Sequence, residues 1–129
     1  MVSGIYKITC SANGKVYIGQ SINLGERKRQ HWDKLRLGKH KNPGLQRDWN
    51  FYGAASFRFE VLEKCPENML NEREIYWIAQ YKATDPSIGY NHQAGGAHAN
   101  KGQKEKPRYK NRTAYKKLRQ ILETPPDNK

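Results

Sequence analysis

The sequence predicts an α+β fold, a small three-stranded sheet with helices packed on its faces. Two observations support this class. Three short segments are rich in β-branched and aromatic residues, as strands are; they are residues 4–10, 15–21 and 56–65. Three longer segments repeat apolar residues every three to four positions, as amphipathic helices do; they are residues 23–37, 43–52 and 67–82. The predicted order is β-β-α-α-β-α, followed by a basic C-terminal extension.

A tight turn joins the first two predicted strands. Asn13-Gly14 supplies the two positive-φ positions of a type I′ hairpin turn. If these two residues form the whole loop, Cys10 stands opposite Tyr17. Side chains alternate along strands, so Tyr6 and Tyr17 then share one face of the hairpin. Gly19 falls on the same face, where a missing side chain would let a phosphate approach.

The next two helices have recognisable ends. The first stops at Gly38, because glycine readily adopts the backbone conformation that ends a helix. The second follows Asn42 and Pro43, a capping residue and a first-turn proline, and it closes at Gly53. On the first helix, Arg27 begins a polar face that continues through His31 and Lys34, at spacings of four and three residues.

The third predicted helix carries a carboxylate on its apolar face. Its stripe runs from Leu70 to Tyr81, and Glu74 occupies a position within it. Burying an unpaired carboxylate costs several kcal/mol. From the residues alone two interpretations remain open. Glu74 pairs with a basic residue such as Arg73 at the edge of the stripe, or it points into a cleft and is satisfied by a metal cation.

Length and composition limit the class of protein. The 129 residues, 36% of them hydrophobic and 14 aromatic, suffice for one domain plus a tail. We assign residues 1–97 to the domain and 98–129 to the extension, in which 113–123 regain a helical period. The chain has neither a membrane-spanning apolar run nor the pattern of a signal peptide. We therefore expect a cytoplasmic protein with no membrane partner.

Cysteine and histidine do not indicate a disulfide framework or a zinc site. Cys10 and Cys65 both fall in predicted strands and are expected to be reduced, buried thiols. None of the four histidines stands at a zinc-ligand spacing from a cysteine.

Positive charge is the strongest feature of the composition. The chain has 24 Lys and Arg against 12 Asp and Glu, a net charge of +12. Residues 98–129 alone hold 10 basic and 3 acidic side chains. Such a charge favours a polyanionic partner, most simply nucleic acid, although an anionic membrane surface would also attract it.

A second basic cluster lies within the domain. Residues 27–47 contain eight basic side chains and only Asp33 as an acid, with Trp32 and Trp49 interleaved or adjacent. Like charges at this density repel unless an anion lies among them, and aromatic rings suit contact with sugars. The segment therefore predicts phosphate contact. Its basic residues are Arg27, Lys28, Arg29, Lys34, Arg36, Lys39, Lys41 and Arg47.

Taken together, these features resemble the GIY-YIG nuclease superfamily. The resemblance rests on GIY at 4–6, YIG at 17–19, Arg27 after the second strand, Glu74 in the third helix, and GYN at 89–91. It extends over roughly residues 3–95. The middle segment, LQRDWNFYG and the strand after it, is most similar to the catalytic domains of phage and intron-type homing endonucleases.

The resemblance implies a three-stranded antiparallel sheet and a metal-dependent DNA endonuclease that hydrolyses phosphodiester bonds. It implies that Glu74 holds one Mg²⁺ or Mn²⁺ ion per active site and that Arg27 neutralises charge on the phosphoryl group. It also implies that Tyr6 and Tyr17, helped by His31, orient or deprotonate the attacking water. Which of these is the general base stays open. Further residues are expected to contact double-stranded DNA or support the site: Lys28, Lys34, His40, Lys41, Arg47 and Asn91.

Four alternatives stay open at this point. The chain could be a complete small nuclease, a type II restriction enzyme of the same family, a catalytic part of something longer, or a non-catalytic DNA-binding module on the same scaffold. A homodimer on DNA would supply two active sites, one for each strand.

Overall fold

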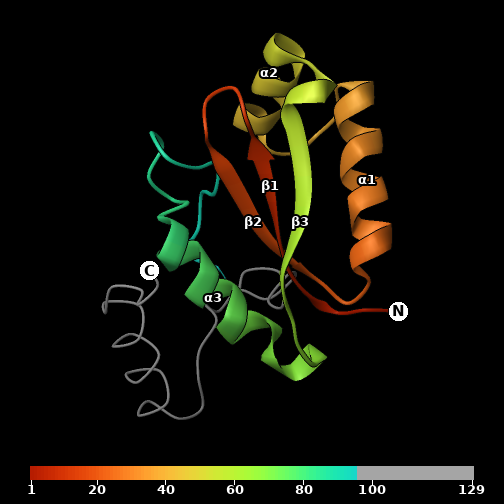
Figure 1. The fold of residues 1–129 in the computed structure, drawn as a ribbon, viewed down its shortest axis with the longest axis vertical. Coiled ribbons are helices and arrows are strands. Elements are labelled where there is room, and N and C mark those ends of the chain that lie inside the picture. Colours follow the sequence, from red (N-terminus) through yellow and green to blue (C-terminus); the bar gives the residue numbers. More distant parts are fainter. Residues whose placement is uncertain (96–129) are drawn as a thin grey trace.

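The computed structural model describes residues 1–95. They form the predicted α+β fold, a three-stranded antiparallel sheet with helices on both sides (Figure 1). The boundary predicted after residue 97, the extension, and the helix at 113–123 lie outside the described residues. The elements in chain order are β1 (Gly4–Cys10), β2 (Val16–Ser21), α1 (Leu24–Leu37), α2 (Pro43–Tyr52), η1 (Ala54–Ser56), β3 (Phe57–Lys64), η2 (Glu67–Met69) and α3 (Leu70–Tyr81).

The first strand is the centre of the sheet, whose order is β2-β1-β3. Tyr6 pairs with Gly19 and Ile8 with Tyr17, so the register is shifted by two residues from the predicted one. The type I′ prediction is wrong for this reason: residues 11–14 all form the loop, and only Gly14 has a positive φ. A shift of two preserves side-chain alternation, so Tyr6 and Tyr17 still share a face.

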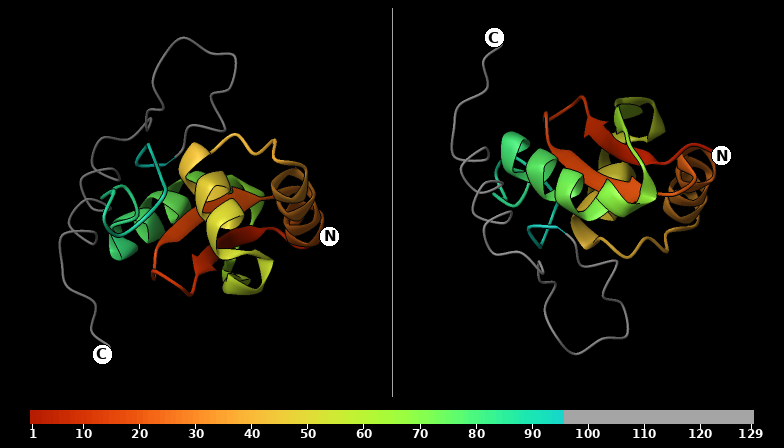
Figure 2. Two further views of the ribbon diagram at one scale, coloured as in Figure 1. Left: turned by 90° about the horizontal axis from the view of Figure 1, so that it is seen from above. Right: turned by 90° about the horizontal axis from the view of Figure 1, so that it is seen from below.

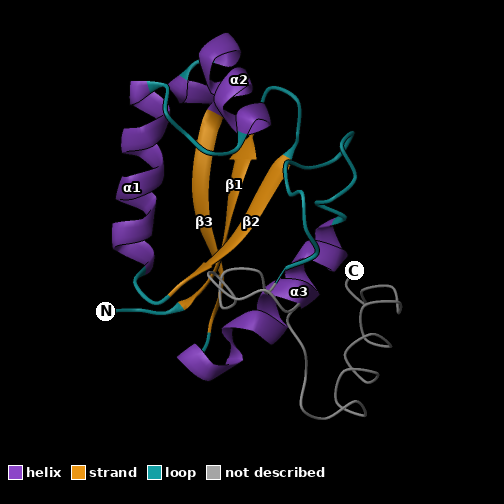
Figure 3. Ribbon diagram, turned by 180° about the vertical axis from the view of Figure 1, so that it is seen from behind, coloured by secondary structure: helices purple, strands orange, loops and turns teal. Residues whose placement is uncertain are grey.

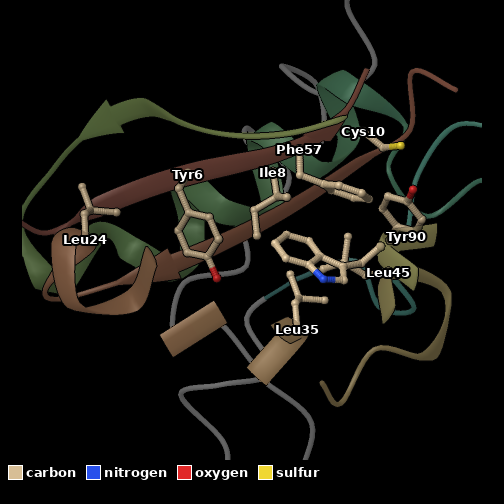
Figure 4. Packing of buried hydrophobic residues seen from close by; sticks show 9 residues of the cluster. Tyr6, Ile8, Cys10, Leu24, Leu35, Leu45, Phe57 and Tyr90 are labelled. Atoms are coloured by element: carbon tan, nitrogen blue, oxygen red, sulfur yellow. The ribbon is translucent and has the colours of Figure 1, made fainter. Parts of the chain in front are cut away.

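The sheet separates two hydrophobic clusters. One lies between the sheet and helices α1 and α2, and the other lies between the sheet and α3 (Figure 2). Alternate residues of β1 point into each, Tyr6 and Ile8 into the first and Ile5 into the second. Figure 4 shows the first cluster, with the Tyr6 ring extending from β1 and its hydroxyl pointing away from the sheet.

The ends at Gly38 and Asn42 follow the predicted chemistry, whereas the cap at Asn23 was not predicted. The Asn23 side chain caps α1 by accepting a hydrogen bond from the Glu26 N–H, and Gly38 ends the helix in the left-handed conformation. Asn42 caps α2 in the same way, through the Leu45 N–H, with Pro43 as the first helical residue. These caps determine where the polar face of α1 and the loop before α2 lie.

Several element boundaries differ from the prediction, most of them by one residue. The helix expected from residue 67 begins as the 3₁₀ turn η2 and becomes α-helical only at Leu70. The third strand ends at Lys64, so Cys65 lies just after it. Cys10 is buried and Cys65 is partly buried, and both are free thiols, as expected.

The outer edge of β2 is covered by the segment after α3 (Figure 3). The Val16 N–H donates to the Ile88 carbonyl, and the Tyr90 N–H donates to the Val16 carbonyl. The Asn91 side chain then hydrogen bonds with both the N–H and the carbonyl of Ile18, at 2.9 Å each. An edge strand would otherwise expose these groups. The edge thus holds residues 88–91 beside the sheet.

No helix in residues 1–95 is long and apolar enough to cross a membrane.

Candidate active site

A cavity of about 470 Å³ opens beside β2, between α1, α3 and the segment around Asn91. It brings together residues that are far apart in the sequence and come from both sides of the sheet. All five residues predicted to be catalytic line it, and four of the six predicted to support the site or bind DNA do so as well. These nine are Tyr6, Tyr17, Arg27, His31, Glu74, Lys34, His40, Lys41 and Asn91.

Hydrogen bonds connect one tyrosine and two histidines in the cavity. The Tyr6 hydroxyl is 2.6 Å from His31 Nε2, and His31 Nδ1 is 2.7 Å from His40 Nε2. The backbone N–H of Asn42 donates to His40 Nδ1 at 3.0 Å. The sequence predicted each ring as a separate support of the site, whereas the structure joins them in one chain.

This chain determines where the protons of the neutral rings lie. Because His40 Nδ1 accepts from the Asn42 N–H, neutral His40 carries its proton on Nε2 and donates it to His31. Neutral His31 then carries its proton on Nε2 and donates to the Tyr6 oxygen. Burial, assisted by the charge of Lys34, lowers the pKa of His40 to about 4, so His40 is neutral at neutral pH. The Tyr6 oxygen is therefore a hydrogen-bond acceptor.

The two tyrosines are protonated at neutral pH. Burial raises the pKa of Tyr6 well above 10, and the neighbouring Tyr17 adds to the rise. Burial and the charge of Glu74 raise the pKa of Tyr17 to about 12. The Arg27 guanidinium opposes both shifts without reversing them. Neither phenol is a base in this site unless more positive charge is added.

Arg27 is anchored to the sheet. Its Nη1 donates to the Gln20 carbonyl at the end of β2, at 3.2 Å. A guanidinium carries five donors and also hydrogen bonds with the Tyr6 phenol, so Arg27 can hold the sheet and still donate to an anion in the cavity. The anchor places a permanent positive charge beside the two phenols.

Glu74 is buried, with 3% of its surface exposed, and lines the cavity from α3. The Gln20 side chain donates to Glu74 Oε1 at 2.8 Å and also to Asn71. The pairing with Arg73 that the sequence left open does not occur, because Arg73 Nε donates to Glu63 at 2.8 Å. Glu74 is the only carboxylate among the residues that line the described cavity.

Close neighbours leave no room for a side chain at Gly4 of the GIY segment or at Gly19 of the YIG segment. A Cβ on Gly19 would lie 2.3 Å from the Tyr6 hydroxyl and 2.4 Å from the adjacent ring carbon. A Cβ on Gly4 would lie 2.1 Å from the Glu63 carbonyl oxygen. The β1–β3 pairing changes register close by, between Ile5 and Tyr6. The sequence predicted that Gly19 leaves room for a phosphate, but the Tyr6 ring occupies the space in front of it.

The basic cluster is divided by its local partners. Arg29 forms ion pairs with Glu26 and Asp33, and Arg36 pairs with Asp33 as well, so α1 neutralises part of its own charge. Lys28 is exposed and lines no cavity described here. Arg47 lies on α2, at a separate shallow groove.

The sequence did not predict a polar cluster around Asp48. Asp48 is buried on α2 and accepts hydrogen bonds from Tyr90 at 2.6 Å and from Asn13 at 2.9 Å, with Arg47 beside it. Although burial raises the pKa of Asp48, these hydrogen bonds outweigh burial and lower it. The cluster ties the β1–β2 loop to α2 and to the segment that covers β2. A carboxylate on an apolar helix stripe could have predicted this cluster, because Asp48 stands three residues after Leu45 on the apolar stripe of α2.

With this geometry established, comparison with known proteins identifies the family. Residues 2–91 match the GIY-YIG catalytic domain. The chain belongs to the GIY-YIG family. It is 37% identical, over 98 residues, to Intron-associated endonuclease 1 of Enterobacteria phage T4. That match takes in 69% of this chain and 40% of the phage protein, so the chain spans about two fifths of this curated relative.

Two solved structures of an endonuclease catalytic domain have a similar fold. A mutant form of the catalytic domain of intron endonuclease I-TevI matches with a TM-score of 0.67 and 33% identity, over 74% of this chain and 97% of that one. A second structure, of the catalytic domain of homing endonuclease I-TevI, matches with a TM-score of 0.64 and 33% identity, over 70% and 98%. GIY-YIG nucleases are in general dependent on a divalent metal.

Proposed function

We propose that this GIY-YIG chain is a divalent-metal-dependent DNA endonuclease of the homing type, with its active site in the cavity beside β2. The observation that carries the proposal is the position of Glu74. A buried carboxylate faces the same cavity as a guanidinium and two phenols. The catalytic-domain relatives, both from intron or homing endonucleases, support the same reaction class.

The residues present suit a hard cation such as Mg²⁺. No group of three or more His, Cys, Asp or Glu residues in 1–95 could form a closed metal cage. Mg²⁺ does not need one, because it keeps several waters and is usually held by one or two carboxylates together with substrate phosphate. A single carboxylate in an open, polar cavity suits this mode of Mg²⁺ coordination. When bound, the cation would supply positive charge that acidifies water and the neighbouring phenols.

The protein's own side chains would bind and orient the substrate. Arg27, held by the Gln20 carbonyl, would donate to the phosphoryl oxygens and stabilise the charge that develops on them. Tyr17 would hydrogen bond with the attacking water. Tyr6 accepts from His31, so its own hydroxyl proton is directed elsewhere, and we assign it to water or phosphate orientation. Lys34 and Lys41 would contact flanking phosphates at the rim.

A double-strand break needs a second active site or a second event. One cavity of this kind occurs in residues 1–95, so one copy would cut one strand at a time. A homodimer on DNA would cut both strands together. Sedimentation of the protein with duplex DNA would distinguish these arrangements.

The test is Glu74→Gln, which keeps the shape of the side chain and its hydrogen bond from Gln20. We expect loss of plasmid cleavage in Mg²⁺ by at least about 100-fold. Duplex binding should be nearly unchanged, and Mn²⁺ binding to the protein–DNA complex, followed by electron paramagnetic resonance, should be lost. Glu72→Gln is the matched control, since Glu72 is on the same helix but lines no described cavity. Wild-type protein that binds DNA but never cuts it with any divalent metal would instead indicate a binding module.

A further inference from the structure

A shallow groove on α2 adjoins the active-site cavity. It is lined by Pro43, Gln46, Arg47, Asn50 and Phe51, together with His40 from the preceding loop. His40 also lines the cavity itself, so the groove and the cavity are neighbours on either side of this one side chain.

The groove presents an unusual combination of exposed side chains. Phe51 is 78% exposed, the most exposed aromatic side chain in the described part of the chain, and its ring contact is with Tyr52, edge to face at 4.9 Å. Asn50 accepts a hydrogen bond from Gln46 but donates its own amide protons to no described residue. Arg47 is 69% exposed; its Nε contacts the buried Asp48 carboxylate at 3.4 Å. None of the residues that line the groove is acidic.

Phe51 belongs to neither hydrophobic cluster of the described residues, so its ring is not needed for the core. The Gln46 side chain donates to the Leu35 carbonyl and accepts from the His40 N–H. These bonds attach α2 to α1 and to the loop between the two helices. The groove is therefore a rigid surface that carries a free aromatic face and a cation. Proteins commonly bind nucleic acid independently of sequence through aromatic faces that contact bases or sugars and cations that contact phosphates.

We propose that this groove binds the DNA segment that flanks the phosphodiester bond in the active site, an inference that rests on the proposed nuclease function. Arg47 contacts a backbone phosphate and Phe51 packs against a sugar or a partly unstacked base. Two observations point to DNA. A duplex whose phosphate reaches the cavity must continue past its rim, and the groove is the continuation on the His40 side. The charge also matches, since Arg47 extends the positive rim formed by Lys34 and Lys41.

The experiment measures binding of a fluorescein-labelled, random-sequence duplex to the full chain in the Glu74→Gln background, where no cleavage interferes. Phe51→Ala should weaken binding about 5- to 100-fold, the range for loss of one stacked base. Phe51→Trp, which keeps an aromatic face, should restore most of the affinity. Arg47→Ala should weaken binding and reduce the slope of log affinity against log salt by about one.

Matched controls separate this role from folding. Val61→Ala removes an exposed apolar side chain from β3, a strand that contributes to neither hollow, and should leave affinity unchanged. Phe51 is mostly exposed, so Phe51→Ala should keep the thermal midpoint of the parent. In the cleaving protein, Phe51→Ala should raise KM for plasmid DNA and leave kcat within about threefold.

Failure of this inference is distinguishable from failure of the proposed function. Absence of metal-dependent cleavage by wild type would overturn the function, while the binding measurement would still test the groove. Unchanged affinity in Phe51→Ala would overturn the inference, whether or not the chain cuts DNA. Unchanged affinity together with loss of self-association in sedimentation would show that the groove binds a second copy instead.

Discussion

Gly19→Ala tests the packing that places Tyr6 in the active site. The new methyl group would lie 2.3 to 2.9 Å from three atoms of the Tyr6 phenol. Carbon atoms pack best at about 3.5–4.0 Å, so the ring would have to move by about 1 Å. It has no room to do so, because Tyr6 is fully buried, stacked on Phe59 at 4.8 Å and hydrogen bonded to His31.

The expected cost combines overpacking with strain on a buried hydrogen bond. Overpacking alone costs about 1–3 kcal/mol, and weakening the buried hydrogen bond costs about 1 kcal/mol more, so we expect a loss of about 2–4 kcal/mol in the free energy of unfolding. For a domain of this size the thermal midpoint should fall by about 10–25 °C. Circular dichroism would follow unfolding, and plasmid nicking would report the displaced phenol as a lower kcat.

A double-mutant cycle identifies the contact. In a Tyr6→Leu background the ring is absent, so Gly19→Ala should cost less than about 1 kcal/mol. Gly25→Ala is the control, because its methyl group would meet only the Asn23 side chain, at 3.9 Å. As a helical glycine, Gly25 should gain up to about 1 kcal/mol from the change. An equal cost of Gly19→Ala with and without the Tyr6 ring would refute the reasoning.

Two further predictions concern charge and burial. The pKa of His40 is lowered to about 4 from an ordinary value near 6.5, so its contribution to stability is complete above about pH 6.5 and is lost as the pH falls toward 4. Urea unfolding at several pH values should show this loss in wild type, and a His40→Gln variant with the same pH dependence would contradict it. Asp48→Ala should cost about 2–4 kcal/mol, because Tyr90 and Asn13 lose their buried acceptor. Glu60→Ala, which breaks only a surface ion pair with a lysine, should cost less than about 1 kcal/mol by the same urea titration; equal losses would show that the Asp48 cluster is not stabilising.

Local chemistry was enough to predict the elements and their faces. Gly38 ends one helix and Asn42 begins the next through contacts within a few residues, and such contacts are visible in the sequence. Side-chain alternation put Tyr6 and Tyr17 together even though the predicted register was wrong by two residues. Periodicity also placed Glu74 among apolar residues, and the structure buries it there.

The prediction of a two-residue turn was wrong because the local preference of Asn13-Gly14 competes with a distant contact. Asn13-Gly14 favours a two-residue turn on its own. In the folded chain the Asn13 side chain donates to Asp48 and accepts from the Lys15 N–H, and the loop widens to four residues. The wider loop thus includes a contact with a residue 35 positions away, which the local sequence does not reveal.

The sequence by itself determined which residue types were available for phosphate and metal chemistry, and on which face of each element they stand. Only the tertiary structure decided their partners: Arg27 on the Gln20 carbonyl, and Glu74 beside the Gln20 side chain, 54 residues away in the chain. The reason is physical. Periodicity and capping act over about one helical turn, whereas the cavity forms where α1, α3 and the covered edge of β2 meet, and that meeting depends on how both faces of the sheet pack.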